Sequence, residues 1–239
     1  MRNENEIVES FKNLIGESNF NVLEFFAGTI GDVAPIISNL MTSFKIYRLK
    51  NRLEKHEIKL KELSEKVVVI EDEKFVDILK NFLFPSILQQ LLDEDEDNKI
   101  GYFLDGFGNV IDSRVIDESE ILILYDTLKN LRFIEIEYLI SFSRAYKNYH
   151  RGKEIKDYFK EDNFSKIKQP IENKLENIGL IDTGKYMTYN ETLNKMGQDV
   201  LKQKFGGSRL RSNVSPQVEI TEFGYLFLNT FSLLDQYMK

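Results

Sequence analysis

Three acidic residues near the middle of the chain have the spacing of calcium ligands. Asp93, Asp95 and Asp97 occupy alternate positions, as the first oxygen ligands of an EF-hand loop do. The rest of the loop pattern is missing. Asn98 stands where the sharp turn needs glycine, and Leu104 stands where a bidentate carboxylate is required. We therefore expect a solvated acidic linker between helices and predict no metal site.

The sequence Gly106-Phe107-Gly108-Asn109 has the opening of a phosphate-binding turn. In such turns the glycines let backbone amides approach a phosphate closely, and a strand precedes them. Here Ile111 occupies the third glycine position, and no strand clearly precedes the sequence. We favour a tight turn that connects two helices, and no small-molecule substrate is evident.

Side chains that commonly serve in catalysis are few. The chain has no cysteine, which excludes a thiol nucleophile, a disulfide framework and a zinc site with cysteine ligands. Of its two histidines, His56 lies in an apolar heptad pattern and His150 lies in a charged turn. No metalloprotease, serine hydrolase or Walker motif occurs. We expect a protein that is not an enzyme and has no cofactor; a carboxylate-based enzyme is an alternative that one sequence leaves open.

Positive charge gathers around one pair of glycines, Gly206-Gly207, in the C-terminal quarter. The formal net charge of the whole chain is −7 and its pI is about 5.1. Bulk attraction to nucleic acid is therefore not expected, and any such binding requires a local patch. The residues predicted to bind nucleic acid in such a patch are Lys202, Lys204, Arg209 and Arg211.

A helix-pairing pattern dominates the first third of the chain. Its residues recur at alternating steps of three and four, which keeps one seam on one side of a helix. The positions predicted to form an oligomer or partner interface are Ile46, Leu49, Leu53, His56, Leu60, Leu63 and Val67. This heptad seam predicts a coiled-coil-type helix that pairs with another helix or with a second copy of itself.

The neighbouring sequence sets the length of this helix and leaves its partner open. Neither proline nor glycine follows Pro35 before Ile70, so we expect one helix from Val33 to about Ile70. An antiparallel hairpin, in which Phe75–Leu92 folds back on the helix, is as compatible with the pattern as a parallel homodimer. His56 is interpreted as a tolerated or register-setting polar residue at a core position.

The C-terminal half has a different pattern. Helices are expected within residues 118–149, followed by an amphipathic helix over Ser165–Asn177, a short strand at Val218–Thr221 and a final helix over Glu222–Tyr237. This order is typical of a winged-helix domain, with the basic cluster on its wing. The presumptive recognition helix argues against DNA binding, because acidic residues offset its lysines; the residues concerned are Lys166, Lys168, Lys174, Glu172 and Glu176.

The sequence also bears on the compartment of the protein. Its start, Met1–Glu6, is polar and acidic, unlike a signal peptide. The longest charge-free stretch, Val33–Phe44, is shorter than the roughly 20 residues that a membrane-spanning helix needs. We expect a cytoplasmic protein without a membrane partner.

Three regions carry a resemblance to a known family. They are Gly31–Pro35 leading into Arg48–Leu53, the helix Phe82–Leu88 with the acidic run that follows it, and the closing Gly179-Leu180-Ile181 and Ile220–Phe227. Together they resemble the Abi-alpha group of abortive phage-resistance proteins, although the tryptophan of that group's middle helix is absent. The resemblance implies a cytoplasmic protein of bacterial or prophage origin that acts in phage conflict through interactions, and it transfers no functional residues.

These observations predict a mainly α fold. Residues 1–115 form a helical region with the long heptad helix, and residues 116–239 form a winged-helix-like α+β domain. The function predicted first is that of a non-enzymatic interaction protein of bacterial or prophage origin, in phage defence. The alternative is a winged-helix DNA-binding regulator that dimerises through the heptad helix.

Overall fold

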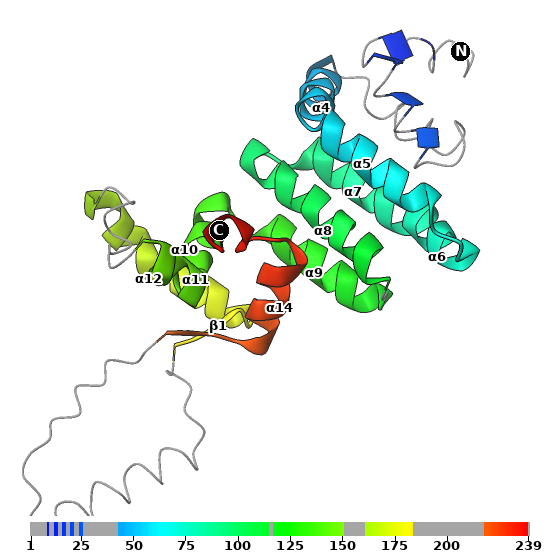
Figure 1. Cartoon of the computed structure of the whole chain (residues 1–239). Coiled ribbons are helices and arrows are strands. Elements are labelled where there is room, and N and C mark those ends of the chain that lie inside the picture. The colour runs from blue at the N-terminus through cyan, green and yellow to red at the C-terminus, as the bar shows by residue number, and fades with distance from the viewer. Residues whose placement is uncertain are drawn as a thin grey trace, which may run out of the picture. The chain divides into compact units, whose positions relative to one another are not determined.

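The computed structural model describes residues 43–114, 117–150, 161–183 and 218–238, together with single positions between Glu9 and Phe25. This part of the chain is mainly helical and contains one pair of short strands, which confirms the predicted mainly α character (Figure 1). None of its helices is long and apolar enough to cross a membrane. The four basic residues predicted to bind nucleic acid, Lys202, Lys204, Arg209 and Arg211, lie outside the described residues.

The contacts divide the chain into two compact units. Unit 1 comprises Met1–Phe133 and Asn229–Leu233, and unit 2 comprises Ile134–Leu228 and Leu234–Lys239. The division that the sequence predicts, at residues 115 and 116, stays a prediction. The helices of unit 1 are α4 (Ser43–Lys55), α5 (Glu57–Val68), α6 (Glu73–Ile78), the π-helical η1 (Leu79–Leu83), α7 (Phe84–Asp93), η2 (Asp97–Lys99), α8 (Ile100–Ser113) and α9 (Glu118–Asn130).

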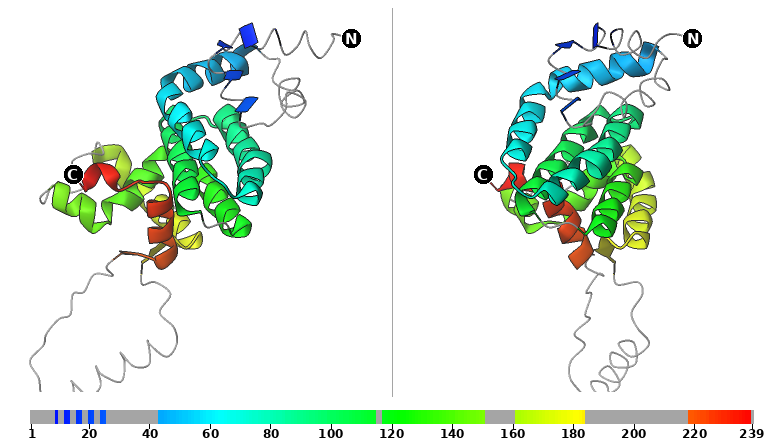
Figure 2. Two further views of the ribbon diagram at one scale, coloured as in Figure 1. Left: turned by 45° about the vertical axis from the view of Figure 1, so that its right-hand side comes forward. Right: turned by 90° about the vertical axis from the view of Figure 1, so that its right-hand side faces the viewer.

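The predicted long helix is interrupted at His56. Its backbone angles, φ −113° and ψ 16°, are not helical, and they separate α4 from α5. Hydrogen bonding nevertheless continues across the break, because the His56 amide donates to the Arg52 carbonyl and the Leu60 amide donates to the His56 carbonyl. Helices α4 and α5 therefore meet at a bend, which the right-hand view of Figure 2 shows. Residues 33–42 of the predicted helix lie outside the described residues.

The heptad seam is buried within a single chain. Helix α4 packs on α7 and helix α5 packs on α8. Five seam residues are at most 3% exposed: Leu49, Leu53, Leu60, Leu63 and Val67. His56 is half-buried, and Ile46 lies in α4 with its side chain outside the description. A second molecule would reach this seam only if these helices separated, and the predicted partner interface stays a prediction.

The glycine-containing sequence 106–109 lies inside helix α8, so the expected turn is wrong. Its glycines allow close packing on two sides. A Cβ atom at Gly108 would lie 3.2 Å from Leu63 Cδ2, and one at Gly106 would lie 2.6 Å from the ring of Phe231. Asn109 also binds the segment that contains Phe231, because its Nδ2 donates to the Thr230 carbonyl at 2.9 Å. Residues 106–109 therefore form a packing surface of helix α8.

The described part of unit 2 contains helices, a strand pair and the C-terminal segment. Its elements are α10 (Phe133–Ser141, which begins at the last residue of unit 1's first segment), α11 (Arg144–Tyr149), α12 (Glu161–Asn177), β1 (Ile181–Asp182), β2 (Glu219–Ile220), α14 (Glu222–Thr230, whose last two residues belong to unit 1) and η4 (Asp235–Tyr237). The strands are antiparallel, with Ile181 opposite Ile220. The predicted order of helix, strand and helix is present, whereas the winged-helix assignment stays a prediction.

Close backbone contacts connect α12, the two strands and α14. Gly179, with φ +79°, ends α12 in a left-handed conformation that glycine adopts readily. The Thr221 amide donates to the Leu180 carbonyl, and the Thr221 hydroxyl accepts from the Gly224 amide at the start of α14. A Cβ at Gly224 would lie 2.2 Å from the Leu180 oxygen, so α14 can approach this turn only with glycine there.

We expect Gly106→Ala to destabilise the protein. The added methyl group would overlap the Phe231 ring, which is completely buried, and overpacking of this kind costs about 1–3 kcal/mol. That cost exceeds the gain of up to about 1 kcal/mol from replacing a helical glycine by alanine. Urea unfolding measures the difference. The matched control is Gly101→Ala in the same helix, whose new Cβ would be 3.8 Å from His56 and should not destabilise. Equal effects of both substitutions would contradict the packing argument.

Candidate nucleic-acid interface

Where its side chains are described, the exposed side of α12 carries cations and amides but no carboxylate. Among residues 165–177, whose side chains are described, the exposed positions are Ser165, Lys166, Ile167, Lys168, Gln169, Pro170, Asn173 and Asn177. Lys166, Gln169, Asn173 and Asn177 follow one another at steps of three or four, so they form one stripe along the helix. Lysine contacts phosphate oxygens, and asparagine and glutamine can pair with adenine in the major groove.

The two acidic side chains of α12 that the structure describes, Glu172 and Glu176, make hydrogen bonds within unit 2. Glu172 accepts a hydrogen bond of 2.7 Å from the Tyr138 hydroxyl, and Glu176 accepts from the amide and the hydroxyl of Thr183. Burial, together with the neighbouring Glu172 carboxylate, raises the pKa of the Tyr138 hydroxyl well above its ordinary value, so this hydroxyl stays a donor. Both carboxylates therefore help to hold the unit together, and Glu172 also lies within ion-pair distance of the exposed Lys168.

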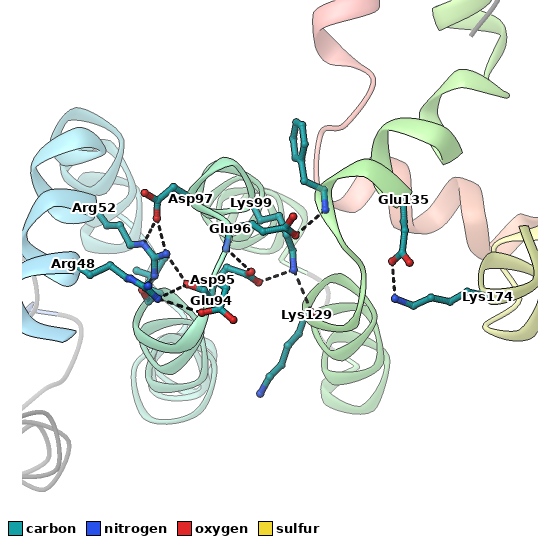
Figure 3. A network of polar contacts seen from close by, with 12 residues as sticks. Arg48, Arg52, Glu94, Asp95, Glu96, Asp97, Lys99, Lys129, Glu135 and Lys174 are labelled. Atoms are coloured by element: carbon teal, nitrogen blue, oxygen red, sulfur yellow. Dashed lines mark hydrogen bonds and ion pairs between the residues drawn. The ribbon is translucent and has the colours of Figure 1, made fainter. Parts of the chain in front are cut away.

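One cation of α12 is also used internally. Lys174 forms a 2.6 Å ion pair with Glu135 of α10, as Figure 3 shows. The Nζ atom of Lys168 lies 3.7 Å from the carboxylate of Glu172, which itself binds Tyr138. The argument against DNA binding that the sequence supplies is thus weakened, because Glu172, Glu176 and Lys174 do not belong to the exposed face. The 3.6-residue period of the helix could have revealed this, since Glu172 and Glu176 flank the buried Ile171 and Leu175.

The strand pair brings the two ends of the basic segment together. Asp182 pairs with Glu219, so the chain leaves β1 and re-enters β2 side by side. The amide and the hydroxyl of Thr221, which donate to the carbonyls of Leu180 and Gly179, attach this strand pair to the end of α12. The four predicted basic contacts lie within the sequence between these strands, and the stripe on α12 is the part of the candidate interface that sequence reasoning missed.

The acidic run of unit 1 links helices and is only partly solvated. Arg52, which is 4% exposed, donates from Nε to Asp97 at 2.8 Å and from Nη2 to the Glu94 carbonyl at 2.6 Å, just beyond the end of α7 (Figure 3). Its Nη1 donates to the Leu91 carbonyl. A cation there is favoured by the negative end of the helix dipole. The side chain of Asp95 is exposed, as expected for a linker, and the described residues contain no cluster that could hold a metal ion.

The acidic run also contacts Lys99, which joins it to α9. Its Nζ lies 2.6 Å from Glu94 Oε2 and 3.1 Å from the carbonyl of Lys129 at the end of α9. Glu94 Oε1 accepts from the Glu96 amide, and Glu96 accepts from the Phe133 amide at the start of α10. The side chains of Lys99 and Glu94 are 1% and 6% exposed. The network therefore connects α4, α7, α8, α9 and the start of α10 through charges.

A groove of about 460 Å³ runs between α5 and α8 in unit 1. Lys59 and Lys66 of α5 pair with Asp105 and Asp112 of α8, one heptad apart, which shows that the two helices are parallel. Ile58, which is 79% exposed, lies on its rim, and His56 lines it. Burial and the neighbouring lysines, Lys55 and Lys59, lower the pKa of the His56 imidazole, against the opposite influence of Asp105 and Asp97.

We expect Lys99→Met to destabilise unit 1 strongly. It would leave the buried Glu94 carboxylate without its cation, and breaking a buried ion pair in this way costs about 3–5 kcal/mol. Denaturant unfolding gives the value. Lys66→Met, which breaks a half-exposed pair, serves as the control and should cost less than about 1 kcal/mol. The double variant Lys99→Met/Glu94→Gln should recover part of the loss, and a loss as large as that of Lys99→Met alone would be the contrary result.

Protonation of His56 should weaken the fold at acidic pH. Because the pKa of the folded imidazole lies below the ordinary value of 6.5, the unfolded chain binds more protons between the two values. The stabilisation is complete above pH 6.5 and is lost as the pH falls through the folded pKa. Urea unfolding of the natural chain and of His56→Gln at pH 7.5 and 5.5 tests this. The natural chain should lose more stability than the variant, and parallel losses would exclude a contribution of His56.

Comparison of the chain with known protein families, curated proteins and solved structures finds no match.

Proposed function

We propose that this protein is a non-enzymatic, cytoplasmic DNA-binding regulator and that unit 2 makes the contact. The observation that carries the proposal is the exposed stripe of α12, with Lys166, Gln169, Asn173 and Asn177 on one side of the helix, which holds no carboxylate among residues 165–177. A helix that enters the major groove needs cations for phosphates and amides or guanidinium groups for base edges. The stripe offers one lysine together with three amides.

The strand pair supports the same proposal. A winged-helix-like domain presents a recognition helix followed by two strands with a basic connection, and here α12 is followed by antiparallel β1 and β2. The sequence between the strands contains Lys202, Lys204, Arg209 and Arg211, which we propose as phosphate contacts. Dimerisation through the heptad seam is not part of the proposal, because Leu49, Leu53, Leu60, Leu63 and Val67 are buried inside one chain.

The distribution of charge between the units also favours unit 2. Unit 1 contains 16 Lys and Arg against 25 Asp and Glu, a net charge of −9, whereas unit 2 contains 16 against 14, a net charge of +2. Such asymmetry between two parts of one chain is typical of proteins in which one part binds nucleic acid. The negative charge of the whole protein is thus a property of unit 1.

A second candidate function rests on unit 1. Ile58 is the most exposed large apolar side chain of the described residues, and it lies beside the groove between α5 and α8. Exposed apolar residues with a polar surround are common in protein docking sites. We propose a protein interaction at this groove as the alternative to DNA binding. The setting implied by the resemblance to abortive phage-resistance proteins, conflict between a bacterium and a phage, applies to either candidate as a proposal.

We expect the protein to bind a mixed-sequence DNA duplex with a strong dependence on salt. Each phosphate that a lysine neutralises contributes about 0.9 to the slope of log K against log salt. Fluorescence anisotropy at several salt concentrations measures both affinity and slope. Lys166→Ala/Lys168→Ala should lower the affinity and reduce the slope by up to about 1.8, because two phosphate contacts are lost.

The control removes the same charge from unit 1. Lys61 and Lys74 are exposed, and Lys61→Ala/Lys74→Ala should leave affinity and slope unchanged. Arg209→Ala/Arg211→Ala tests the segment between the strands separately, and unchanged binding would remove that segment from the interface. Absence of binding by the natural chain even at low salt would refute the DNA proposal and leave the groove of unit 1 as the candidate site.

A further inference from the structure

The most exposed large apolar side chains of the described residues gather on one helix. They are Ile58 at 79%, Val69 at 71% and Val68 at 68%, and they lie in α5 or directly after its last residue. Residues 58 and 69 are about three helical turns apart, so Ile58 and Val69 lie on nearly the same side of the helix. This side faces away from the buried seam residues of α5, Leu63 and Val67.

Four exposed charges flank the line from Ile58 to Val69. They are Lys61, Glu62, Glu65 and Lys66. Because successive helical residues are rotated by about 100°, Glu62 and Lys66 lie on one flank of this line. Lys61 and Glu65 lie on the other flank. Each flank therefore carries one acid and one base, and the six positions have the same order of apolar, basic and acidic residues when read from either end.

Such a face is complementary to itself. When two copies of α5 pack antiparallel, the same flanks meet, and Glu62 lies beside Lys66 of the second copy. When they pack in parallel, opposite flanks meet, and Glu62 lies beside Lys61 of the second copy. Opposite charges therefore approach each other in either direction. An interface with two-fold symmetry requires a patch of this kind, because both copies use the same surface.

The charges of this face are available to a second copy. Among the described residues, none forms an ion pair with Lys61, Glu62 or Glu65. Lys66 lies 2.6 Å from Asp112 of α8, and both side chains are about half-exposed. Exposed pairs contribute little to stability, so Lys66 can exchange this partner for a carboxylate of another molecule.

We propose that this α5 face, formed by Ile58, Val69 and the four flanking charges, binds the same face of a second copy of the chain. The inference goes beyond DNA binding by unit 2 and does not depend on it. Ile58 also lies on the rim of the groove between α5 and α8, whereas Val69 does not line that groove. The heptad seam stays closed in such a dimer, because its residues lie on the opposite side of α5.

Sedimentation velocity of the full-length chain measures this self-association. At near-physiological salt, where charges more than about 8 Å apart are screened, the natural chain should dimerise with a dissociation constant of about 1–100 µM. Val69→Glu and Ile58→Glu should each raise this constant about tenfold or more, because a carboxylate replaces an apolar side chain in the contact. Ile123→Glu, the same kind of change at an exposed position of α9, is the control and should leave it unchanged.

Two results of this measurement would overturn the proposal. The first is a natural chain that stays monomeric at about 500 µM. The second is an effect of Ile58→Glu without an effect of Val69→Glu, which would assign the contact to the groove.

A change of charge separates this contact from general repulsion. Glu62→Lys makes the chain less negative, which by itself favours association of two acidic units, but it places the new cation beside a lysine of the second copy. We therefore expect Glu62→Lys to weaken self-association about threefold or more. Glu120→Lys, at an exposed position of α9, changes the net charge equally and should not weaken it. Equal effects of the two substitutions would contradict the proposed contact.

Cysteine crosslinking tests the contact directly, because the natural chain contains no cysteine. Under oxidation, Ile58→Cys alone should form linked dimers in a parallel pair, and a mixture of Ile58→Cys and Val69→Cys should form them in an antiparallel pair. Ile123→Cys measures random crosslinking, and yields no higher than this background in both tests would overturn the proposal. Duplex binding is measured separately by anisotropy, and its absence in a chain that dimerises would refute the DNA proposal alone.

Discussion

An ammonium group cannot stay in an apolar interior without an opposite charge and hydrogen-bond acceptors, and Lys99 is almost completely buried. Its requirement is met by the Glu94 carboxylate and by the Lys129 carbonyl. Glu94 in turn holds the following backbone through the Glu96 amide, and Arg52 reaches the same turn from α4. Because α8 begins directly after Lys99, the helices of unit 1 are joined at the place where this charge is neutralised.

The position of α8 along α5 follows from that junction. Arg52 contacts Asp97, 45 residues later, and the pairs Lys59–Asp105 and Lys66–Asp112 are each separated by 46 residues. A nearly constant separation means that the two helices run parallel and in register from the acidic turn onward. Close approach along this register depends on small residues in α8, since Gly108 faces Leu63. The heptad seam thus finds its partners within unit 1, in α7 and α8.

Periodicity predicted what depends on local spacing. It identified the buried seam of Leu49, Leu53, Leu60 and Leu63 and the order of helix, strand and helix in unit 2, because burial on one face imposes the period. The bend at His56 was missed, since no proline or glycine marks it. The sequence also does not reveal why residue 106 must be glycine, because the ring of Phe231 that packs against it lies more than 100 residues away along the chain. A count of charges along the sequence does not separate the faces of α12, and therefore does not reveal its exposed stripe.

Whether an acidic protein can bind a polyanion depends on where its carboxylates lie on the surface. Unit 1 has a net charge of −9, but its carboxylates Glu94, Asp97, Asp105 and Asp112 are paired with cations that join helices. In unit 2, Glu135, Glu172 and Glu176 are likewise engaged, and the exposed residues of α12 between 165 and 177 are neutral or positive. At physiological salt, charges more than about 8 Å apart are largely screened from each other. Attraction to a phosphate is therefore determined by the residues of the nearest helix face, and the net charge of the chain has little influence on it.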